Sequence, residues 1–339
     1  MKIIVTGGCG FVGSNICAFL KNLSFKVVSV DNLSKTYSKL NLKRLNNLNI
    51  KNHNIDISNK DKFLKLSFKS DIIIDCCADP AVESSRKDIS KNISNNLITT
   101  YSVLEKAKKD NSKLIFLSTS RIYPIKDSYK KFNIFYKKNK KDLFDERSNI
   151  IGPKTIYGFS KLASEMLIKE YNYAFKIDYL INRCGLITGP WQFGKVEQGL
   201  VSLWLWKHLN KDNNLYYKGY KGLGNQIRDV LFINDLCELI KLQIKNFKKI
   251  KNQTFCVGGG IKNSANLNEL TRICEDTTKN KLKIKRDLRT SIYDIPFYIT
   301  SLKKVKKYYN WMPETNLRSG FYILLEWMKK NYTLIKPHF

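Results

Sequence analysis

The chain has 339 residues, of which 43% are hydrophobic, and carries a formal net charge of +31 at pH 7. This length and apolar content suffice for one large or two medium domains with a sizeable core. No run of about 18 apolar residues occurs, which excludes a membrane-spanning helix. The N-terminus is typical of a strand rather than a signal peptide, so we expect a cytoplasmic protein. The lysines are spread along the whole chain, which favours a global bias over a nucleic-acid-binding patch.

The eight cysteines and three histidines point to no special chemistry. No Cys-x-x-Cys pair occurs, and most cysteines stand in apolar runs, which is typical of buried free thiols in a reducing compartment. No cysteine or second histidine stands at metal-ligand spacing from any histidine. We therefore predict no metal site.

The first twenty residues contain the pattern of a dinucleotide-binding turn. A predicted strand, Lys2–Thr6, is followed by glycines at the spacing G-x-x-G-x-x-G and by a predicted helix, Phe11–Leu20. The first amides of a helix are free and its dipole favours negative charge, while a missing Cβ lets a pyrophosphate approach the backbone. The residues predicted to meet the cofactor here are Gly7, Gly10, Phe11, Val12 and Gly13.

A dinucleotide-binding unit also needs an acidic residue at the end of its second strand, and this chain has one there. A second predicted strand, Phe25–Val30, ends at Asp31. A carboxylate there can accept hydrogen bonds from a ribose 2′-hydroxyl and would repel a 2′-phosphate, which favours NAD over NADP. A glycine turn without a ligand is the alternative, and the complete strand–glycine–helix–strand–Asp unit argues against it.

Strands continue to alternate with helical patterns as far as residue 185. The further elements predicted are the strands His53–Ile57, Asp71–Cys77, Lys113–Ser118 and Ile177–Asn182 and the helix Ile93–Lys108. This order predicts an α/β fold with a doubly wound, parallel Rossmann sheet that binds ligands at the carboxyl ends of its strands. We expect Asp56 and Ile57 near the adenine and Ala78 beside the pyrophosphate.

Three residues form the candidate catalytic group. Tyr157 and Lys161 are four residues apart on a predicted helix, Ile156–Tyr173, and so lie on one face. The lysine ammonium favours the phenolate, which makes Tyr157 a candidate general base. Thr119, at the end of a predicted strand, would hold the substrate oxygen. Such a Tyr–Lys pair also occurs by chance on helix surfaces, but here it follows a dinucleotide fold and a Ser/Thr strand end.

The second half of the chain differs from the first in its pattern of aromatic, basic and polar residues. A long connection, residues 124–150, contains a basic run with interleaved aromatic residues at 130–141, which is either a solvated loop or an active-site flap. Residues 191–199 combine aromatic and polar side chains, as expected of a wall that faces a sugar or a base. Arg228 stands at a loop-to-strand junction suited to a phosphate, and Arg289 lies in a predicted loop.

Two domains are expected. The NAD-binding Rossmann domain would comprise residues 1–189 with a returning segment at about 229–260, in which the strand Val230–Ile233 and the helix Asp235–Ile244 rejoin the main sheet. A smaller α+β lobe for the substrate would comprise residues 190–228 and 261–339.

Together these motifs resemble the extended short-chain dehydrogenase/reductase family, specifically its nucleotide-sugar epimerases. The resemblance covers nearly the whole chain, through TGGCGFVGSN, DNLS, STSRIY, YGFSK, RDV and the closing WMP. Within the family, GPWQFGKVEQG, the insert ending in FDE and GNQIRDVLFINDL are most similar to enzymes that act at C2 of a CDP-deoxysugar.

The resemblance implies a tightly held NAD+ that is regenerated in every turnover. Tyr157 would take a proton from a sugar hydroxyl while hydride passes to the nicotinamide, and hydride would return to the other face of the keto-sugar. Family roles would place Gly7, Gly10, Gly13, Asp31, Asn32, Asp56, Asn96 and Lys161 on the cofactor and Gln192, Arg228 and Arg289 on the nucleotide diphosphate. They also imply a homodimer built on the helices that hold Asn96 and Tyr157.

Other functions stay open. A C2-epimerase and a 4-epimerase of a UDP- or GDP-sugar share the same hydride chemistry, so the sequence does not distinguish between them. A 4,6-dehydratase usually has Asp-Glu directly after the strand-end Thr, where this chain has Ser120-Arg121. A non-catalytic NAD-binding regulator is a further alternative, which the intact Thr119, Tyr157 and Lys161 argue against.

Overall fold

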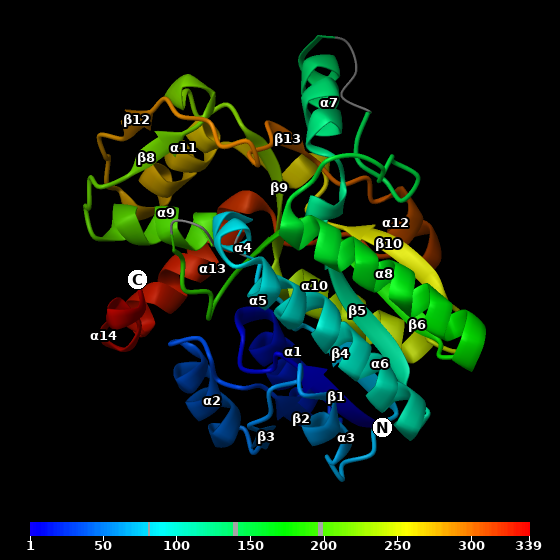
Figure 1. Ribbon diagram of the computed structural model, residues 1–339. Helices are drawn as coiled ribbons and strands as arrows, with labels where there is room; N and C mark the ends of the chain where they lie inside the picture. The colour runs from blue at the N-terminus through cyan, green and yellow to red at the C-terminus, as the bar shows by residue number, and fades with distance from the viewer. Residues whose placement is uncertain (81, 138–141, 196–198) are drawn as a thin grey trace. The chain divides into compact units, whose positions relative to one another are not determined.

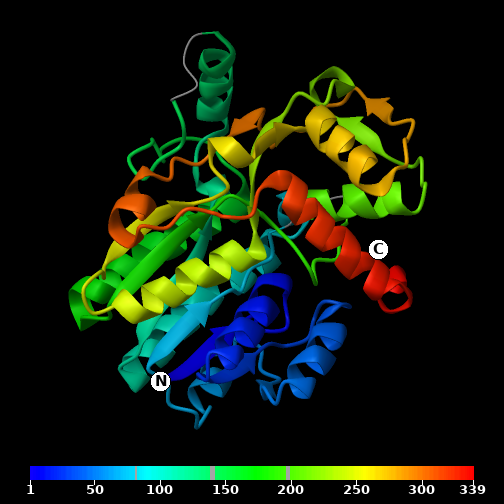
Figure 2. The ribbon, with the colours of Figure 1, turned by 180° about the vertical axis from the view of Figure 1, so that it is seen from behind.

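Figures 1 and 2 show the computed structural model of the protein, which describes residues 1–80, 82–137, 142–195 and 199–339. The described chain forms two compact units, each made of three segments. The first unit comprises Met1–Ile122, Thr155–Arg183 and Cys237–Phe255. The second comprises Tyr123–Lys154, Cys184–Leu236 and Cys256–Phe339.

The first unit is built on a seven-stranded sheet in the order β10-β6-β5-β4-β1-β2-β3. Its strands are β1 (Lys2–Thr6), β2 (Lys26–Val30), β3 (Asn52–His53), β4 (Ile72–Asp75), β5 (Lys113–Thr119), β6 (Tyr179–Cys184) and β10 (Gln253–Val257). Its helices are α1 (Phe11–Asn22), α2 (Ser38–Asn47), α3 (Lys60–Leu64), α4 (Val82–Lys87), α5 (Ile89–Ile93), α6 (Thr99–Asp110), α8 (Ile156–Phe175) and α10 (Ile233–Asn246), with a π-helical turn η1 (Ser94–Ile98) and a 3-10 turn η2 (Ser120–Ile122).

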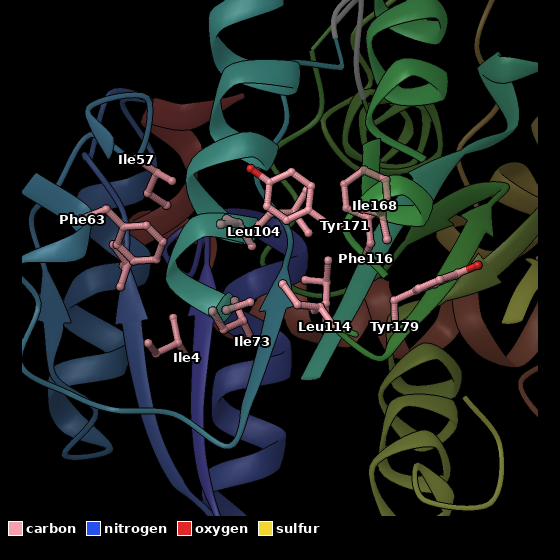
Figure 3. Packing of buried hydrophobic residues seen from close by; sticks show 14 of the residues in the cluster. Ile4, Ile57, Phe63, Ile73, Leu104, Leu114, Phe116, Ile168, Tyr171 and Tyr179 are labelled. Atoms are coloured by element: carbon pink, nitrogen blue, oxygen red, sulfur yellow. The ribbon is translucent and has the colours of Figure 1, made fainter. Parts of the chain in front are cut away.

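This unit confirms the predicted Rossmann fold. The pairs β2–β3, β1–β2, β1–β4 and β4–β5 are all parallel. The central strands β1, β2 and β4 are largely apolar β-branched runs that are buried, as parallel sheets require. On one face they pack against side chains from α3, α6 and α8, and Figure 3 shows Phe63, Leu104 and Ile168 from these helices around Phe116 and Ile73 of the sheet.

The strand order reverses between β1 and β4. The chain runs outward from β1 to β2 and β3, then returns to β4 on the other side of β1 and continues outward to β5 and β6. Dinucleotides bind at such a switch point, at the carboxyl ends of the strands. The residues that follow β1, β2 and β4 therefore surround one position.

The second unit contains a four-stranded sheet and a two-stranded one. Its strands are β7 (Leu186–Thr188), β8 (Tyr216–Lys218), β9 (Ile227–Phe232), β11 (Ser264–Asn266), β12 (Lys285–Asp287) and β13 (Phe297–Tyr298). Its helices are α7 (Ile125–Lys137), α9 (Leu200–Leu209), α11 (Leu267–Thr278), α12 (Lys303–Tyr309), α13 (Leu317–Lys330) and α14 (Tyr332–Ile335), with the short turns η3 (Tyr220–Gly222), η4 (Ile261–Asn263) and η5 (Lys336–His338). Within the described ranges of both units, no helix is long and apolar enough to cross a membrane.

The expected return of residues 229–260 to the main sheet is only partly right. Strand β9 does not join that sheet, because it pairs with β7, β11 and β13 instead. Its fully buried Asp229 accepts hydrogen bonds from the backbone of Gly260 at 2.9 Å and Thr300 at 3.1 Å, which fixes two loops of the second unit around it. The returning segment is Cys237–Phe255, which supplies most of α10 and β10.

Residues 123–154 also fall in the second unit, although the sequence boundaries put them in the first. Much of the expected loop is the helix α7, and the Ser128 hydroxyl on it donates to the Phe297 carbonyl at 2.6 Å and accepts from the Phe297 amide at 3.0 Å. Phe144 adds a backbone hydrogen bond to Ile299. These bonds attach the insertion to the strand β13. The end of the predicted basic run, residues 138–141, lies outside the described residues.

A buried ion pair joins three elements of the first unit. The Glu165 carboxylate on α8 accepts hydrogen bonds from the Nε and Nη2 groups of Arg183 on β6, the latter at 2.8 Å. It also accepts a hydrogen bond from the Ser118 hydroxyl on β5 at 2.5 Å. Both charged side chains are almost completely buried. Removing one member of such a pair leaves an uncompensated charge in the interior.

We therefore expect Glu165→Gln to lower the free energy of unfolding by roughly 3–5 kcal/mol. Urea denaturation followed by circular dichroism measures the change. Glu170→Gln is the matched control, because Glu170 lies on the same helix and is exposed. Equal effects of the two substitutions would contradict the assignment.

Candidate active site

The turn between β1 and α1 has the shape of a pyrophosphate cradle. Gly7 has φ +61°, and a Cβ at Gly13 would lie 2.2 Å from the Gly7 carbonyl oxygen, so helix and turn can meet only without side chains. The N-cap of α1 is Gly10, and no side chain caps its amides. The first-turn N–H groups, those of Phe11, Val12 and Gly13, have no partner within the helix. Free amides in a close-packed glycine turn fit a dinucleotide pyrophosphate.

Asp31 follows β2, and its carboxylate connects the glycine turn with the loop after β2. Its Oδ2 accepts from the Cys9 amide at 3.0 Å and its Oδ1 from the Leu33 amide at 2.7 Å, so the carboxylate holds the glycine turn and the loop after β2 together. The backbone of Gly10 also bonds to this carboxylate, which has about four acceptor sites and so can still accept from a ribose hydroxyl. Burial raises the pKa of Asp31, while these backbone hydrogen bonds oppose the rise.

The other predicted cofactor residues lie in the loops of the first unit. Asn32 is exposed and accepts from the Ser34 amide, and Asp56 accepts from the amide and hydroxyl of Ser58. Ile57 is part of the core, and the exposed Ala78 lies in the segment that follows β4. These contacts with the cofactor stay predictions.

Asn96 is fully buried in the π-helical turn η1. Its Oδ1 accepts from the Asp79 amide at 3.0 Å and its Nδ2 donates to the Asn92 carbonyl at 2.8 Å. The side chain therefore holds the loop after β4 at the switch point. The predicted contact of Asn96 with the cofactor would add to this bracing role, and it stays a prediction.

Helix α8 begins directly against the end of β5. A Cβ at Gly158 would lie 2.0 Å from the carbonyl oxygen of Arg121, so only glycine allows this approach. The Arg121 amide in turn donates to the Thr119 hydroxyl at 3.2 Å. Tyr157, which precedes Gly158, is 7% exposed and Thr119 is 8% exposed. The structure therefore brings the predicted general base and the predicted hydroxyl to the same strand end.

Lys161 lies one helical turn further along β5. It is almost completely buried, and its Nζ stands 3.8 Å from the centroid of the Phe116 ring. A cation over an aromatic face is stabilised by the ring quadrupole, the more so when water is excluded. The contacts of Lys161 with Phe116 and of Glu165 with Ser118 thus hold α8 along β5, with Lys161 on the face that carries Tyr157.

Two of the predicted substrate residues are engaged within the second unit. The Gln192 amide bonds to Thr188, Ser202 and the Ile187 carbonyl, which leaves one N–H for a ligand. Arg289 is exposed and forms a bidentate pair with Asp287 at 3.0 Å, which lowers the pKa of that carboxyl to about 2. Their contacts with substrate stay predictions, and residues 196–198 of the expected sugar-facing wall lie outside the described residues.

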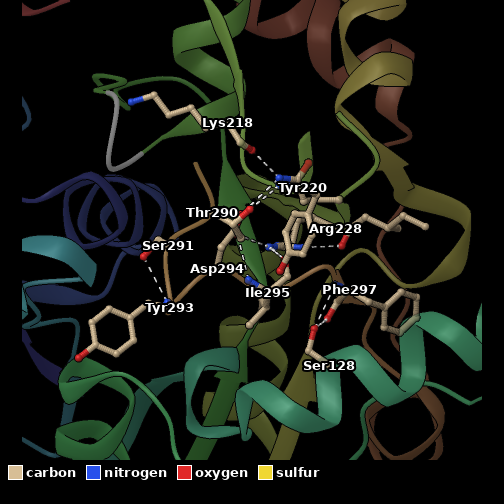
Figure 4. Close-up of polar contacts among 12 residues, drawn as sticks. Ser128, Lys218, Tyr220, Arg228, Thr290, Ser291, Tyr293, Asp294, Ile295 and Phe297 are labelled. Atoms are coloured by element: carbon tan, nitrogen blue, oxygen red, sulfur yellow. Dashed lines mark hydrogen bonds and ion pairs between the residues drawn. The ribbon is translucent and has the colours of Figure 1, made fainter. Parts of the chain in front are cut away.

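Arg228 stands on β9 in a dense polar cluster, shown in Figure 4. Its guanidinium donates to the carbonyls of Ile227 at 2.8 Å and Ile295 at 2.5 Å and lies 3.7 Å from an Asp294 oxygen. The loop after β12 is further held where Thr290 accepts from the Tyr220 amide at 2.8 Å. The cluster orients Arg228, as a phosphate-binding arginine requires.

The sequence did not reveal the residues that support this site. Glu165 stands in a helix with several charges, so its burial cannot be distinguished from surface exposure by pattern alone. The sequence likewise showed no sign of the ion pair between Lys35 and Asp79, which are 3.2 Å apart. Among the residues that the structure describes, no group of His, Cys, Asp and Glu is placed to hold a metal ion.

The switch-point cradle and the position of α8 on β5 define a dinucleotide-dependent enzyme. The chain belongs to the NAD dependent epimerase/dehydratase family, which it matches over residues 3–258. The predicted family and the predicted cofactor, NAD, are thereby confirmed.

Individual relatives cover nearly the whole chain. It is 28% identical to CDP-paratose 2-epimerase of Salmonella typhi over 96% of this chain and 99% of that protein. It is 30% identical to a putative UDP-glucose 4-epimerase of Methanocaldococcus jannaschii over 97% of this chain and 99% of that protein. Its structure resembles that of UDP-glucuronic acid 4-epimerase from Bacillus cereus, solved with UDP-glucuronic acid and NAD, with a TM-score of 0.81, 26% identity and coverage of 98% of this chain and 100% of the other.

The position of Asp31 predicts selectivity for NAD. In Asp31→Ala, the preference for NAD over NADP should fall by roughly 10- to 100-fold, since a hydrogen bond to a charged group contributes about 1.5–3 kcal/mol. Because burial raises the pKa of Asp31, its carboxyl is neutralised at higher pH than an ordinary aspartate, and the wild-type preference should also weaken as the pH is lowered.

Calorimetric titration with both nucleotides at pH 7.5 and pH 5 measures these changes. Asp61→Ala, which removes an exposed carboxylate on α3, is the control. An unchanged preference in Asp31→Ala would show that the carboxylate does not face the ribose.

Proposed function

We propose that the protein is an epimerase that inverts one carbon of a nucleotide-linked sugar through transient oxidation. The observation that carries this proposal is the placement of α8 on β5, which brings Tyr157 and Lys161 to the Thr119 strand end of an NAD fold. The family and the relatives support it, because they include epimerases of nucleotide sugars with different bases and at different carbons.

The described residues can supply the proton chemistry. When bound, NAD would accept hydride from the reacting carbon and return it to the opposite face. Tyr157 takes the proton of the sugar hydroxyl and later gives it back. Lys161, held over Phe116, stabilises the phenolate by its charge. The Thr119 hydroxyl holds the reacting oxygen at the strand end while the keto-sugar turns over.

For the substrate, we favour a CDP-deoxysugar inverted at C2. The motifs from the sequence and the similarity to CDP-paratose 2-epimerase along the full chain support this choice. Arg228 would contact the diphosphate, with Gln192 and Arg289 as further ligands. A 4-epimerase of a UDP- or GDP-sugar is the second candidate, supported by the similarity to the putative UDP-glucose 4-epimerase. The pocket, rather than the hydride chemistry, distinguishes the two.

A product analysis tests the function. The protein with NAD+ is incubated with CDP-, UDP-, GDP- and dTDP-sugars, CDP-paratose included, and products are followed by proton NMR in D2O. We expect inversion at one carbon without deuterium uptake there, because the hydride returns internally. Deuterium uptake at the inverted carbon would contradict hydride return, and a 4-keto-6-deoxy product would identify a dehydratase.

Tyr157→Phe is the matched variant for this experiment. It should abolish turnover while the protein still retains nucleotide, because only the proton-transferring hydroxyl is removed. A fully active variant would contradict the role of Tyr157. Binding of NAD by the wild type with no turnover of any sugar would favour the regulator alternative.

We further propose that the protein is a homodimer that pairs through α8 and its neighbour α6. Side chains on α8 at a spacing of seven residues are apolar and exposed, namely Phe159 at 52%, Met166 at 59% and Tyr173 at 78%. Positions seven apart recur on one face of a helix, so they form a continuous stripe. Helix α6 packs beside α8 in the first unit, as Figure 1 shows. An exposed apolar stripe of this kind is typical of an interface.

A charge in the stripe should prevent pairing. We expect Met166→Glu to convert a species of twice the chain mass to a monomer in light scattering, because a buried unpaired carboxylate is costly. Lys43→Glu, at an exposed position on α2 away from the stripe, should remain dimeric. A monomeric wild type would disprove the interface.

A further inference from the structure

An ion pair crosses the cofactor site in the first unit. Lys35 belongs to the loop after β2 and Asp79 to the loop after β4, and the Lys35 Nζ lies 3.2 Å from the Asp79 Oδ1. Strand β1 lies between β2 and β4 in the sheet. The pair therefore passes over the carboxyl end of β1, where Gly7 begins the turn that cradles the pyrophosphate.

The two sides of the pair are held differently. The Asp79 amide donates to Asn96 at 3.0 Å, and the Asp79 carbonyl accepts from Asn92 at 3.3 Å. Both asparagine side chains are buried, so Asp79 stands on a fixed support. The side chain of Lys35 is 41% exposed, and its loop is attached through local turns at Leu33 and Ser34. The aspartate is thus the fixed side and the lysine is the movable one.

Charges around the pair locate it beside the dinucleotide. Tyr37 follows Lys35 by two residues, and burial together with the charges of Asp31 and Asp79 raises the pKa of its hydroxyl to about 12. Asp31, predicted to bind the ribose, and Asp79 are therefore both near the Tyr37 hydroxyl. Unpaired, Asp79 would repel a pyrophosphate at the turn, and Lys35 neutralises it.

We propose that Lys35 and Asp79 form a clasp that closes over bound NAD and slows its dissociation. The nucleotide can leave the turn only when the ion pair opens. The inference rests on NAD as the cofactor and on no particular sugar. It also fits the proposed epimerisation, in which the reduced cofactor has to stay bound until hydride has returned to the sugar.

The rate of NAD release tests the clasp directly. The protein is loaded with radiolabelled NAD+, chased with excess unlabelled NAD+, and the retained label is followed by filter binding. Lys35→Met and Asp79→Asn should each release NAD faster by roughly two- to fivefold, the range expected for an ion pair of up to about 1 kcal/mol. The double variant should release no faster than the single ones, because both substitutions remove the same interaction.

Two further comparisons separate the clasp from simpler explanations. The reversed pair, Lys35→Asp with Asp79→Lys, should release NAD more slowly than either single variant if the pair itself holds the cofactor. Lys39→Met, at an exposed position on α2, is the matched control and should release NAD at the wild-type rate. Salt should speed release from the wild type more than from the double variant, because it screens the exposed pair.

The outcomes that overturn the clasp are distinct. If Lys35→Met speeds release but Asp79→Asn slows it or leaves it unchanged, Lys35 is a phosphate ligand and no clasp exists. A wild type that retains no label would also overturn the proposal. Neither result depends on a sugar substrate, so failure of the clasp and failure of the proposed epimerase activity are observed separately.

Discussion

The close contact of α8 with the end of β5 is the constraint on which the rest of the site depends. Gly158 allows the helix to meet the backbone after Thr119, and the buried Glu165 ties the same helix to Ser118 and Arg183. The steric requirement at Gly158 fixes the position of the start of α8, and the ion pair of Glu165 fixes the position of its middle. Tyr157 directly precedes the first of these fixed points, Gly158, and so stands on a rigid element, which is what a proton-transferring group needs to hold its geometry.

The same helix connects the chemistry to the cofactor loops. Ser160 on α8 donates to the buried Asn92 at 3.4 Å, and Ser164 donates to the carbonyl of Asn96 at 3.3 Å. Asn92 and Asn96 hold the backbone of Asp79, which in turn pairs with Lys35. A single polar network within the first unit thus runs from α8 to both sides of the dinucleotide turn. The π-helical turn at Asn96 is of a type often found at functional sites.

Local patterns were sufficient for much of the fold. The β1–glycine–α1–β2 unit was predicted because each step has a strong local signal. The membership of β9 in another sheet could not be predicted, because its partners β7, β11 and β13 are distant in sequence or only two or three residues long. Likewise, the Tyr–Lys spacing indicated the candidate site. The residues that hold the site in place could not be predicted, because their role depends on burial. Sequence periodicity does not show whether a single charged residue such as Glu165 is buried.

The hydrogen bonds that Asp31 accepts from backbone amides limit how this chain can evolve. In many dinucleotide-binding proteins an acidic residue at this place can be exchanged to admit a phosphorylated ribose. Here the same carboxylate also fixes Cys9 of the glycine turn and Leu33 of the following loop. A lineage that replaced it would loosen its binding turn, whatever the replacement did for recognition of the ribose. Adaptation to another coenzyme would therefore require an earlier compensating change, which makes the present preference hard to reverse by single substitutions.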